Sequence, residues 1–326
     1  MMTHRSFFFI IGLVFSVATR GQESGSVFNF LSLPTSAHSI ALGGRNISTI
    51  EDDASLIFQN PAQMANVSSN SMNVNFMTYM RGSKTGSAAF VRAQGERGTW
   101  GICAQFVGYG KMKETLVTGE VIGDMHALDM AISGMYCYNL SERWSGGATG
   151  RFIYSKLADY SSVGLAVDLG LNYFDEEHGF SFSAVAANLG GQVKAYGEHH
   201  ERLPFDLQIG FSKNLGHAPI RFTVTLVDLT RWSKGYYYHV SQEPKAGTIL
   251  INHFNVGIDI IPTKQFYIAA GYNFRRAYEM KAAGSSHAAG LTFGAGLNIK
   301  NFKLGLAYAK YHVSAPTLAV SLSYSL

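Results

Sequence analysis

The sequence has little charge and almost no cysteine. Asp, Glu, Lys and Arg make up 15% of the 326 residues, against roughly 25% in soluble domains, and only two cysteines occur. The basic residues are scattered and the net charge is only +4, so the chain lacks the basic stripe that binds nucleic acid. Low charge together with 13% aromatic residues is typical of a chain whose outer wall faces lipid.

Long apolar runs are missing after the first twenty residues. Residues 6–18 (SFFFIIGLVFSVA) follow His4 and Arg5 and are too short to span a bilayer. They fit an export signal, with a small-residue cleavage site at 16–18 (SVA) or 19–21 (TRG). We expect residues 1–21 to be a signal peptide that is removed, the alternative being a retained N-terminal anchor. Any further membrane contact must then come from strands.

The sequence does contain a regular alternation of apolar and polar residues, with a period of two residues. From about Ser71 to Leu326, apolar and polar residues alternate; in 317–326 (TLAVSLSYSL), for example, Leu318, Val320 and Leu322 fall on one face and serines on the other. Side chains alternate between the two faces of a strand, so the pattern predicts a sheet with one apolar and one polar face. After an export signal, this favours a transmembrane antiparallel β-barrel with lipid outside and a polar lumen.

The pattern predicts about 14 strands, an even number, as bacterial single-chain barrels require. We place them near 71–80, 85–93, 98–108, 125–138, 144–157, 160–174, 178–190, 203–214, 218–230, 249–261, 264–275, 286–298, 301–311 and 316–326. Short turns then fall at one end and long connections (109–124, 191–202, 231–248, 276–285) at the other. This sorting predicts long loops outside the cell and both termini in the periplasm, with the protein in the cell outer membrane.

The same alternation assigns faces within each strand. Seven charged residues should point into the lumen, where opposite charges can pair or be solvated; they are Asp129, Arg151, Asp168, Asp206, Arg221, Asp259 and Lys303. In the sixth strand, Leu169 should face lipid. Gly170 should face the lumen, where a serine should be tolerated.

Residues 22–70 do not alternate and precede the barrel of 71–326. Short helices joined by Gly and Pro turns fit this segment. A barrel of ~14 strands is too wide for wall side chains alone to fill, so we expect the segment to form a hatch, a chain segment inserted in the barrel. The alternative is a flexible periplasmic tail.

The residues of this segment carry a family resemblance. The pieces stand in one order and at close spacing: 27–31 (VFNFL), 33–37 (LPTSA), 41–44 (ALGG), 46–48 (NIS), Asp52-Asp53 and Asn60-Pro61-Ala62, with Gly43 and Gly44 in the third. They resemble the PorQ family of the type IX (Por) secretion system of Bacteroidota-type bacteria, with Phe28 in place of the family's Tyr. The ALGG to NPA stretch also resembles PorV and long-chain fatty-acid-transporter-like barrels. The N-terminal pieces carry the sharper match.

The resemblance implies a non-enzymatic barrel of a cell-surface attachment complex. It implies partners of three kinds: a PorZ-like surface protein that the barrel anchors, a PorU-like sortase that joins cargo to lipopolysaccharide, and a PorV-like barrel. It implies contact with outer-membrane lipid and lipopolysaccharide, and no cofactor. An outer-membrane transporter for hydrophobic molecules is the alternative function, by analogy with the fatty-acid barrels.

No catalytic constellation stands out in the sequence. His199-His200 lies between Glu198 and Glu201, but adjacent histidines point apart and no third ligand is fixed nearby, so we predict a solvated loop rather than a metal site. More distinctive are Trp232 and the run Tyr236-Tyr237-Tyr238 in a long loop. This run is either a partner-docking patch or part of the upper aromatic girdle.

We predict that Cys103 and Cys137 form no disulfide. They lie on neighbouring strands whose predicted pairing puts Cys103 opposite a residue near ~130, which leaves Cys137 about seven residues along, roughly 24 Å at ~3.4 Å per residue. A disulfide needs Cα atoms within about 7 Å. Thiol titration of the unfolded, unreduced chain should therefore find two free thiols; a single blocked pair would refute the pairing.

Overall fold

The computed structural model describes residues 26–79, 82–115, 118, 120–237, 243–282, 288–312 and 315–326. The expected signal peptide, residues 1–21, lies outside these ranges. Within them, no helix combines the length and the apolar character needed to cross a membrane.

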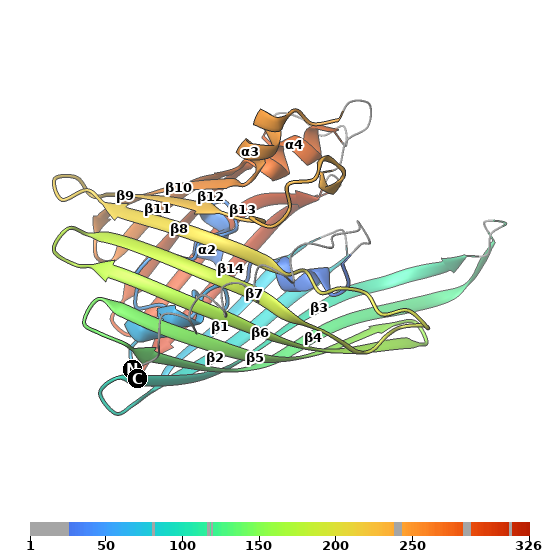
Figure 1. Cartoon of the computed structure of the whole chain (residues 1–326), viewed down its shortest axis with the longest axis horizontal. Helices are drawn as coiled ribbons and strands as arrows, with labels where there is room; N and C mark the ends of the chain where they lie inside the picture. Colours follow the sequence, from blue (N-terminus) through green and yellow to red (C-terminus); the bar gives the residue numbers. More distant parts are fainter. Residues whose placement is uncertain are drawn as a thin grey trace, which may run out of the picture.

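Fourteen antiparallel strands form a closed barrel (Figure 1), as the alternation predicts. Each strand pairs with its neighbours in sequence, and β1 pairs with β14 to close the ring. The strands are β1 (Ser71–Thr78), β2 (Lys84–Gln94), β3 (Gly98–Thr115), β4 (Val121–Asn139), β5 (Trp144–Leu157), β6 (Tyr160–Asp175), β7 (Phe180–Lys194), β8 (Asp206–Asn214), β9 (Ile220–Leu226), β10 (Phe254–Thr263), β11 (Phe266–Asn273), β12 (Leu291–Ile299), β13 (Phe302–His312) and β14 (Ala315–Ser325).

The predicted faces are confirmed along the wall. In β3, Ile102 and Phe106 are 55% and 46% exposed, whereas the intervening Cys103 and Gln105 are buried. In β6, Leu165, Val167 and Leu169 point outward and Asp168 inward. Because backbone groups pair all around the ring, the barrel has no free sheet edge, and its outer face offers lipid an almost purely apolar surface.

The largest errors in the predicted strand boundaries all lie at the end with the long connections. Residues 109–115 and 121–124 are not loop; they continue β3 and β4 into a long hairpin that extends beyond the other strands (Figure 1). Residues 249–252, predicted as strand, belong to the helix α3 (Ala246–Asn252), and 274–282 form α4 (Phe274–Ala282). The hairpin is exposed on both faces, so burial no longer imposes alternation on its sequence.

The two cysteines are free, as predicted. Their register differs from the predicted one: Cys103 lies opposite Ser133, and Cys137 opposite Thr99. The three-residue difference from the predicted register is already present at the pair Thr115–Val121 near the tip of the hairpin, so it comes from where the chain turns. The β-bulge between Gly108 and Lys111 shifts the pairing by only one residue. Four residues along a strand still separate the cysteines by roughly 14 Å.

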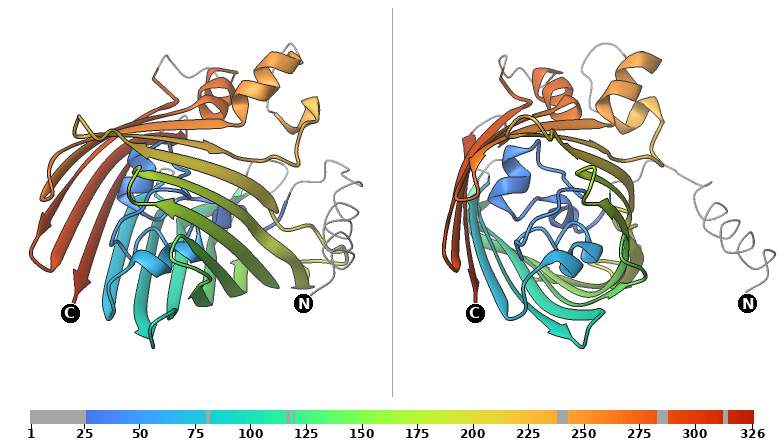
Figure 2. Two further views of the ribbon diagram at one scale, coloured as in Figure 1. Left: turned by 60° about the vertical axis from the view of Figure 1, so that its left-hand side comes forward. Right: turned by 90° about the vertical axis from the view of Figure 1, so that its left-hand side faces the viewer.

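The described part of the N-terminal segment lies inside the barrel (Figure 2), so the expected hatch is present and the tail alternative is wrong. The hatch comprises residues 26–70 and contains η1 (Asn29–Ser32), α2 (Ala37–Ala41) and η2 (Pro61–Asn66). Its apolar side chains pack against inward-facing apolar wall residues in three clusters around Phe30, Ile40 and Met64. The hatch thus supplies the core that the wide barrel cannot form from its wall.

We expect Leu169→Arg to lower the yield of inserted barrel strongly. The Leu169 side chain is 49% exposed on the outer face of β6, and an arginine near the bilayer midplane costs ~2–4 kcal/mol. Heat-modifiable migration on gels measures the folded fraction. Leu169→Ala, which shortens the side chain without adding charge, is the control, and equal folded fractions for the two variants would contradict the lipid-facing assignment.

Candidate functional site

The Gly43-Gly44 pair forms a tight turn that ends α2. Both residues have a positive φ, 96° and 93°, which residues other than glycine rarely adopt. The Gly43 backbone approaches β11 so closely that a Cβ on Gly271 would meet Leu42 and Gly43. The motif therefore positions the hatch against the wall.

Asn60-Pro61-Ala62 caps η2 and sets it on the opposite wall. The Asn60 side chain accepts a hydrogen bond from Ala62 N at 3.0 Å and donates one to Ile47 O at 2.8 Å, while Pro61 occupies the first helical turn. The Ala62 carbonyl accepts from Ser145 Oγ at 3.1 Å.

Asp52 and Asp53 also hold the hatch. Asp52 accepts from the backbone and hydroxyl of Ser68 and pairs with Lys303 of β13 at 3.0 Å. The Asp53 carboxylate accepts a hydrogen bond from the backbone N–H of Ser55 and another, at 2.8 Å, from the hydroxyl of Ser323 in β14. All the motif residues predicted for the hatch thus make structural contacts.

A buried cluster of four charges connects the hatch to β9 and β10. The His38 Nδ1 atom lies 3.0 Å from Glu51 and its Nε2 atom lies 2.8 Å from Asp259. Arg221 reaches the same two carboxylates, at 2.5 Å for Glu51 and 2.7 Å for Asp259. Since both ring nitrogens face carboxylates, both must carry protons, so His38 is an imidazolium and the cluster holds two positive and two negative charges.

Electrostatics favour the same protonation state. Burial by itself would lower the pKa of the His38 imidazole, but the carboxylates of Glu51 and Asp259 outweigh it and raise the pKa to about 10. The Tyr267 ring stacks on the imidazole at 4.1 Å between centroids.

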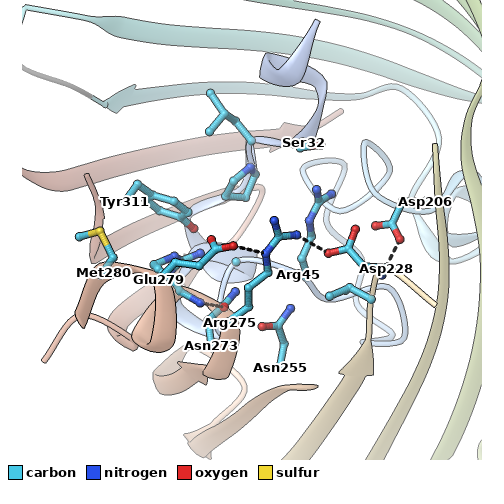
Figure 3. A pocket seen from close by; sticks show the side chains of 15 residues that line it. Ser32, Arg45, Asp206, Asp228, Asn255, Asn273, Arg275, Glu279, Met280 and Tyr311 are labelled. Atoms are coloured by element: carbon cyan, nitrogen blue, oxygen red, sulfur yellow. Dashed lines mark hydrogen bonds and ion pairs between the residues drawn. The ribbon is translucent and has the colours of Figure 1, made fainter. Parts of the chain in front are cut away.

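A charged pocket of about 380 Å³ lies between the hatch and α4 (Figure 3). Three arginines and three carboxylates line it: Arg45, Arg275, Arg276, Asp206, Asp228 and Glu279. Arg275 lies between two of the acids, 2.7 Å from Asp228 and 3.0 Å from Glu279. We refer to this space as the mouth pocket. Burial would raise the pKa of Asp228, but the charges of Arg275 and Arg231 lower it.

The aromatic residues predicted as a docking patch separate into different roles. Trp232 is 50% exposed, whereas Tyr237 is 1% exposed and therefore not offered to a partner. The Tyr236 hydroxyl is engaged by Arg231 at 2.9 Å and by Arg275 at 2.5 Å, and Tyr238 lies outside the described residues. Among the described members of the predicted patch, Trp232 is therefore the one whose side chain is largely exposed.

The pairing of the barrel wall is irregular in β7. Its pairing with β6 shifts between Val167 and Leu169, because Asn188 adopts φ 60° and bulges out of the ladder. Inside the bulge, Arg151 binds Asp168 at 2.5 Å and the Asn188 side chain at 3.1 Å. Outside, a shallow groove of about 840 Å³ faces lipid and is lined by Phe152, Leu165 and several glycines.

The remaining candidates do not form a site. His199 and His200 are both exposed. Within the described ranges, the three-member group of possible metal ligands is Asp175, Glu177 and His178 in a short turn, where Asp175 is already paired with His178 at 3.0 Å and Arg143 at 3.4 Å.

Sequence reasoning missed most of the charges that matter. It identified Arg221 and Asp259 as inward, but gave no role to His38, Glu51 or Arg45. A buried histidine in the hatch beside inward charges of mixed sign was the available signal. The residues of α4 could not be found, because residues 274–275 were predicted as the end of a strand and the rest of the helix as a loop.

Comparison with known proteins yields structural relatives only. Neither family models nor curated sequences match the chain. Among solved structures, it resembles the toluene transporter TodX of Pseudomonas putida, with TM-score 0.58, 11% identity, and 90% of this chain and 98% of that one covered. It also resembles CymD, a monoaromatic hydrocarbon channel, with TM-score 0.57, 12% identity, and 90% of this chain and 97% of that one covered. A third similar structure is a FadL homologue of Pseudomonas aeruginosa, with TM-score 0.54, 10% identity, and 89% of this chain and 98% of that one covered. The chain therefore has the fold of these outer-membrane barrels.

We expect Gly170→Ser to loosen the hatch, which corrects the expectation that serine is tolerated there. Gly170 does face the lumen, but a Cβ would collide with the Asn60 side chain and lie 3.0 Å from Pro61. Overpacking of this kind costs roughly 1–3 kcal/mol. Limited proteolysis of the hatch in the folded barrel reports the change. Gly134→Ser is the control, because no atom lies within 4 Å of that position; equal resistance of both variants would argue against the contact.

We expect the stability of the hatch to fall as pH rises from about 6.5 to 10. The His38 pKa is raised from 6.5 to about 10, so its stabilising charge is fully present below pH 6.5 and lost by about pH 10. Thermal unfolding followed by near-ultraviolet circular dichroism over this range measures the slope. His38→Gln should flatten it, and an unchanged slope in that variant would assign the dependence to other groups.

Proposed function

We propose that this protein is a non-enzymatic outer-membrane scaffold of a surface attachment complex, whose end with the long connections holds a PorZ-like surface partner. The family resemblance of the hatch motifs supports the kind of complex. PorU-like and PorV-like proteins and lipopolysaccharide belong to the same proposal.

The observation that carries the proposal is the filling of the lumen. The hatch packs against the wall through three apolar clusters and the buried charge cluster around His38. The cavity above it, the mouth pocket, is lined by charged side chains. An apolar solute would have to desolvate these charges, which is unfavourable. The surfaces left for function are then the outer ones.

The rim beside α3 has the properties of a protein-docking surface. Trp232, Leu250 and Ile251 are each 50% exposed; we refer to them as the rim patch. The Trp232 indole is held by a hydrogen bond to Leu229 O at 2.6 Å and by a tilted contact with the His253 ring, 4.1 Å between centroids. A rigid exposed tryptophan is a frequent anchor of protein interfaces, because little side-chain entropy is lost on binding.

Transport of hydrophobic molecules is the second candidate function. It is favoured by the fold shared with TodX and CymD and by the bulge in β7 beside the outer groove. Against it, the inner side of the bulge is occupied by the Arg151–Asp168 ion pair. A lateral route for an apolar solute would have to pass this pair.

We expect the triple variant Trp232→Ser, Leu250→Ser and Ile251→Ser to insert normally and to release the PorZ-like protein into the medium. Cell fractionation and immunoblotting of that protein measure the release. The matched control is Leu140→Ser with Leu215→Ser, two residues exposed to 56% and 40% in short turns at the opposite end of the barrel.

Two results would count against the scaffold. The first is full retention of the surface protein by the triple variant and by deletion of the 227–253 connection. The second is reduced uptake of toluene in a deletion strain with surface attachment intact. The second result would favour transport instead.

A further inference from the structure

The mouth pocket contains buried hydrogen-bond donors that have no partner. They are Asn255 Nδ2, Arg276 Nη1 and the Tyr311 hydroxyl, and all three residues line the pocket. The Tyr311 oxygen interacts with the Arg276 guanidinium, so what this hydroxyl lacks is an acceptor for its own hydrogen. Asn255 is only 2% exposed. Buried donors are almost always satisfied in folded proteins, since an unmade bond costs about 1–3 kcal/mol. These three atoms therefore point to something that the pocket binds.

The acceptors of the same pocket are already in use. Asp228 accepts from Tyr236 at 3.0 Å and from Arg275 at 2.7 Å. Glu279 accepts from Arg275 at 3.0 Å. Asp206 accepts from Asp228 N at 2.7 Å. Each carboxylate of the pocket thus already has a donor, whereas the three donors have no acceptor, so a ligand that satisfies them brings acceptor atoms.

Positive charge is also available beside these donors. Among the described residues Arg45 makes no hydrogen bond or ion pair, and its side chain projects into the pocket from the hatch (Figure 3). The Arg276 guanidinium lies over the Tyr311 ring at 3.8 Å and donates to Gly43 O at 3.3 Å through Nη2. Its position is therefore fixed while Nη1 remains unused.

We propose that the mouth pocket binds an oxyanion, a carboxylate or a phosphate group, between Arg45, Arg276, Asn255 and Tyr311. Such groups accept several hydrogen bonds at once and are held most strongly by arginine. The volume of about 380 Å³ accommodates the anionic group together with part of the molecule that carries it. This inference does not depend on the docking or transport proposals.

The experiment is isothermal titration of the purified full-length barrel in detergent, at constant ionic strength, with inorganic phosphate, acetate and glucose 1-phosphate. We expect saturable binding of at least one. Arg45→Gln should weaken it about tenfold, the effect of losing one charge-assisted contact, and Tyr311→Phe, which removes only the hydroxyl, should weaken it about threefold. Arg92→Gln, the same charge change at the other end of the barrel, should leave it unchanged. Heat-modifiable migration verifies that each variant is folded.

The ligands distinguish the source of the anion. Binding of glucose 1-phosphate at least as tight as that of inorganic phosphate would support a site for an anionic sugar. Tighter binding of the small ions would support a free anion. The proposal would be overturned if none of the three ligands bound saturably, or if wild type, Arg45→Gln and Tyr311→Phe had identical affinities. The unpaired donors would then be satisfied by water.

Discussion

The arrangement of this molecule depends on one buried set of charges. His38 and Glu51 belong to the hatch, and Arg221 and Asp259 lie directly opposite each other on β9 and β10. Each hatch residue contacts one wall residue, His38 with Asp259 and Glu51 with Arg221, so two separate parts of the hatch are fixed against one place on the wall. Buried ion pairs add little net stability, but removing one member costs about 3–5 kcal/mol. The cluster therefore specifies one position of the hatch more than it strengthens the barrel.

The remaining hatch contacts follow from this position. The Gly43-Gly44 turn lies against β11, and Asn60-Pro61-Ala62 rests on the glycines of β5 and β6. With the lumen filled, the open space lies at the mouth, where α4 and the hatch enclose charged side chains. The same fold in TodX and CymD belongs to proteins described as a transporter and a channel. Here the pocket at the mouth is lined by charged side chains, which is the basis of the proposed scaffold role.

The wall was predictable from the sequence and the site was not. Alternation fixes strand number and faces because each strand has a lipid side and a lumen side, as Ile102 and Cys103 illustrate. It fails in the hairpin beyond the wall and in α3 and α4, where no membrane imposes two different faces. Hatch motifs around Gly43 and Asn60 indicated an inserted segment. Pairings such as His38 with Asp259 join residues 221 positions apart, and local patterns carry no information on them.

The most direct test of the account is a double-mutant cycle between Glu51→Gln and Arg221→Met. Hydrogen exchange of backbone amides in residues 37–66 gives the free energy of local opening of the hatch in each of the four proteins. If the charge cluster holds the hatch, the two changes should be coupled by about 1–3 kcal/mol, since one cluster is lost in either variant. Additive effects, within about 0.5 kcal/mol, would show that the cluster does not determine the position of the hatch.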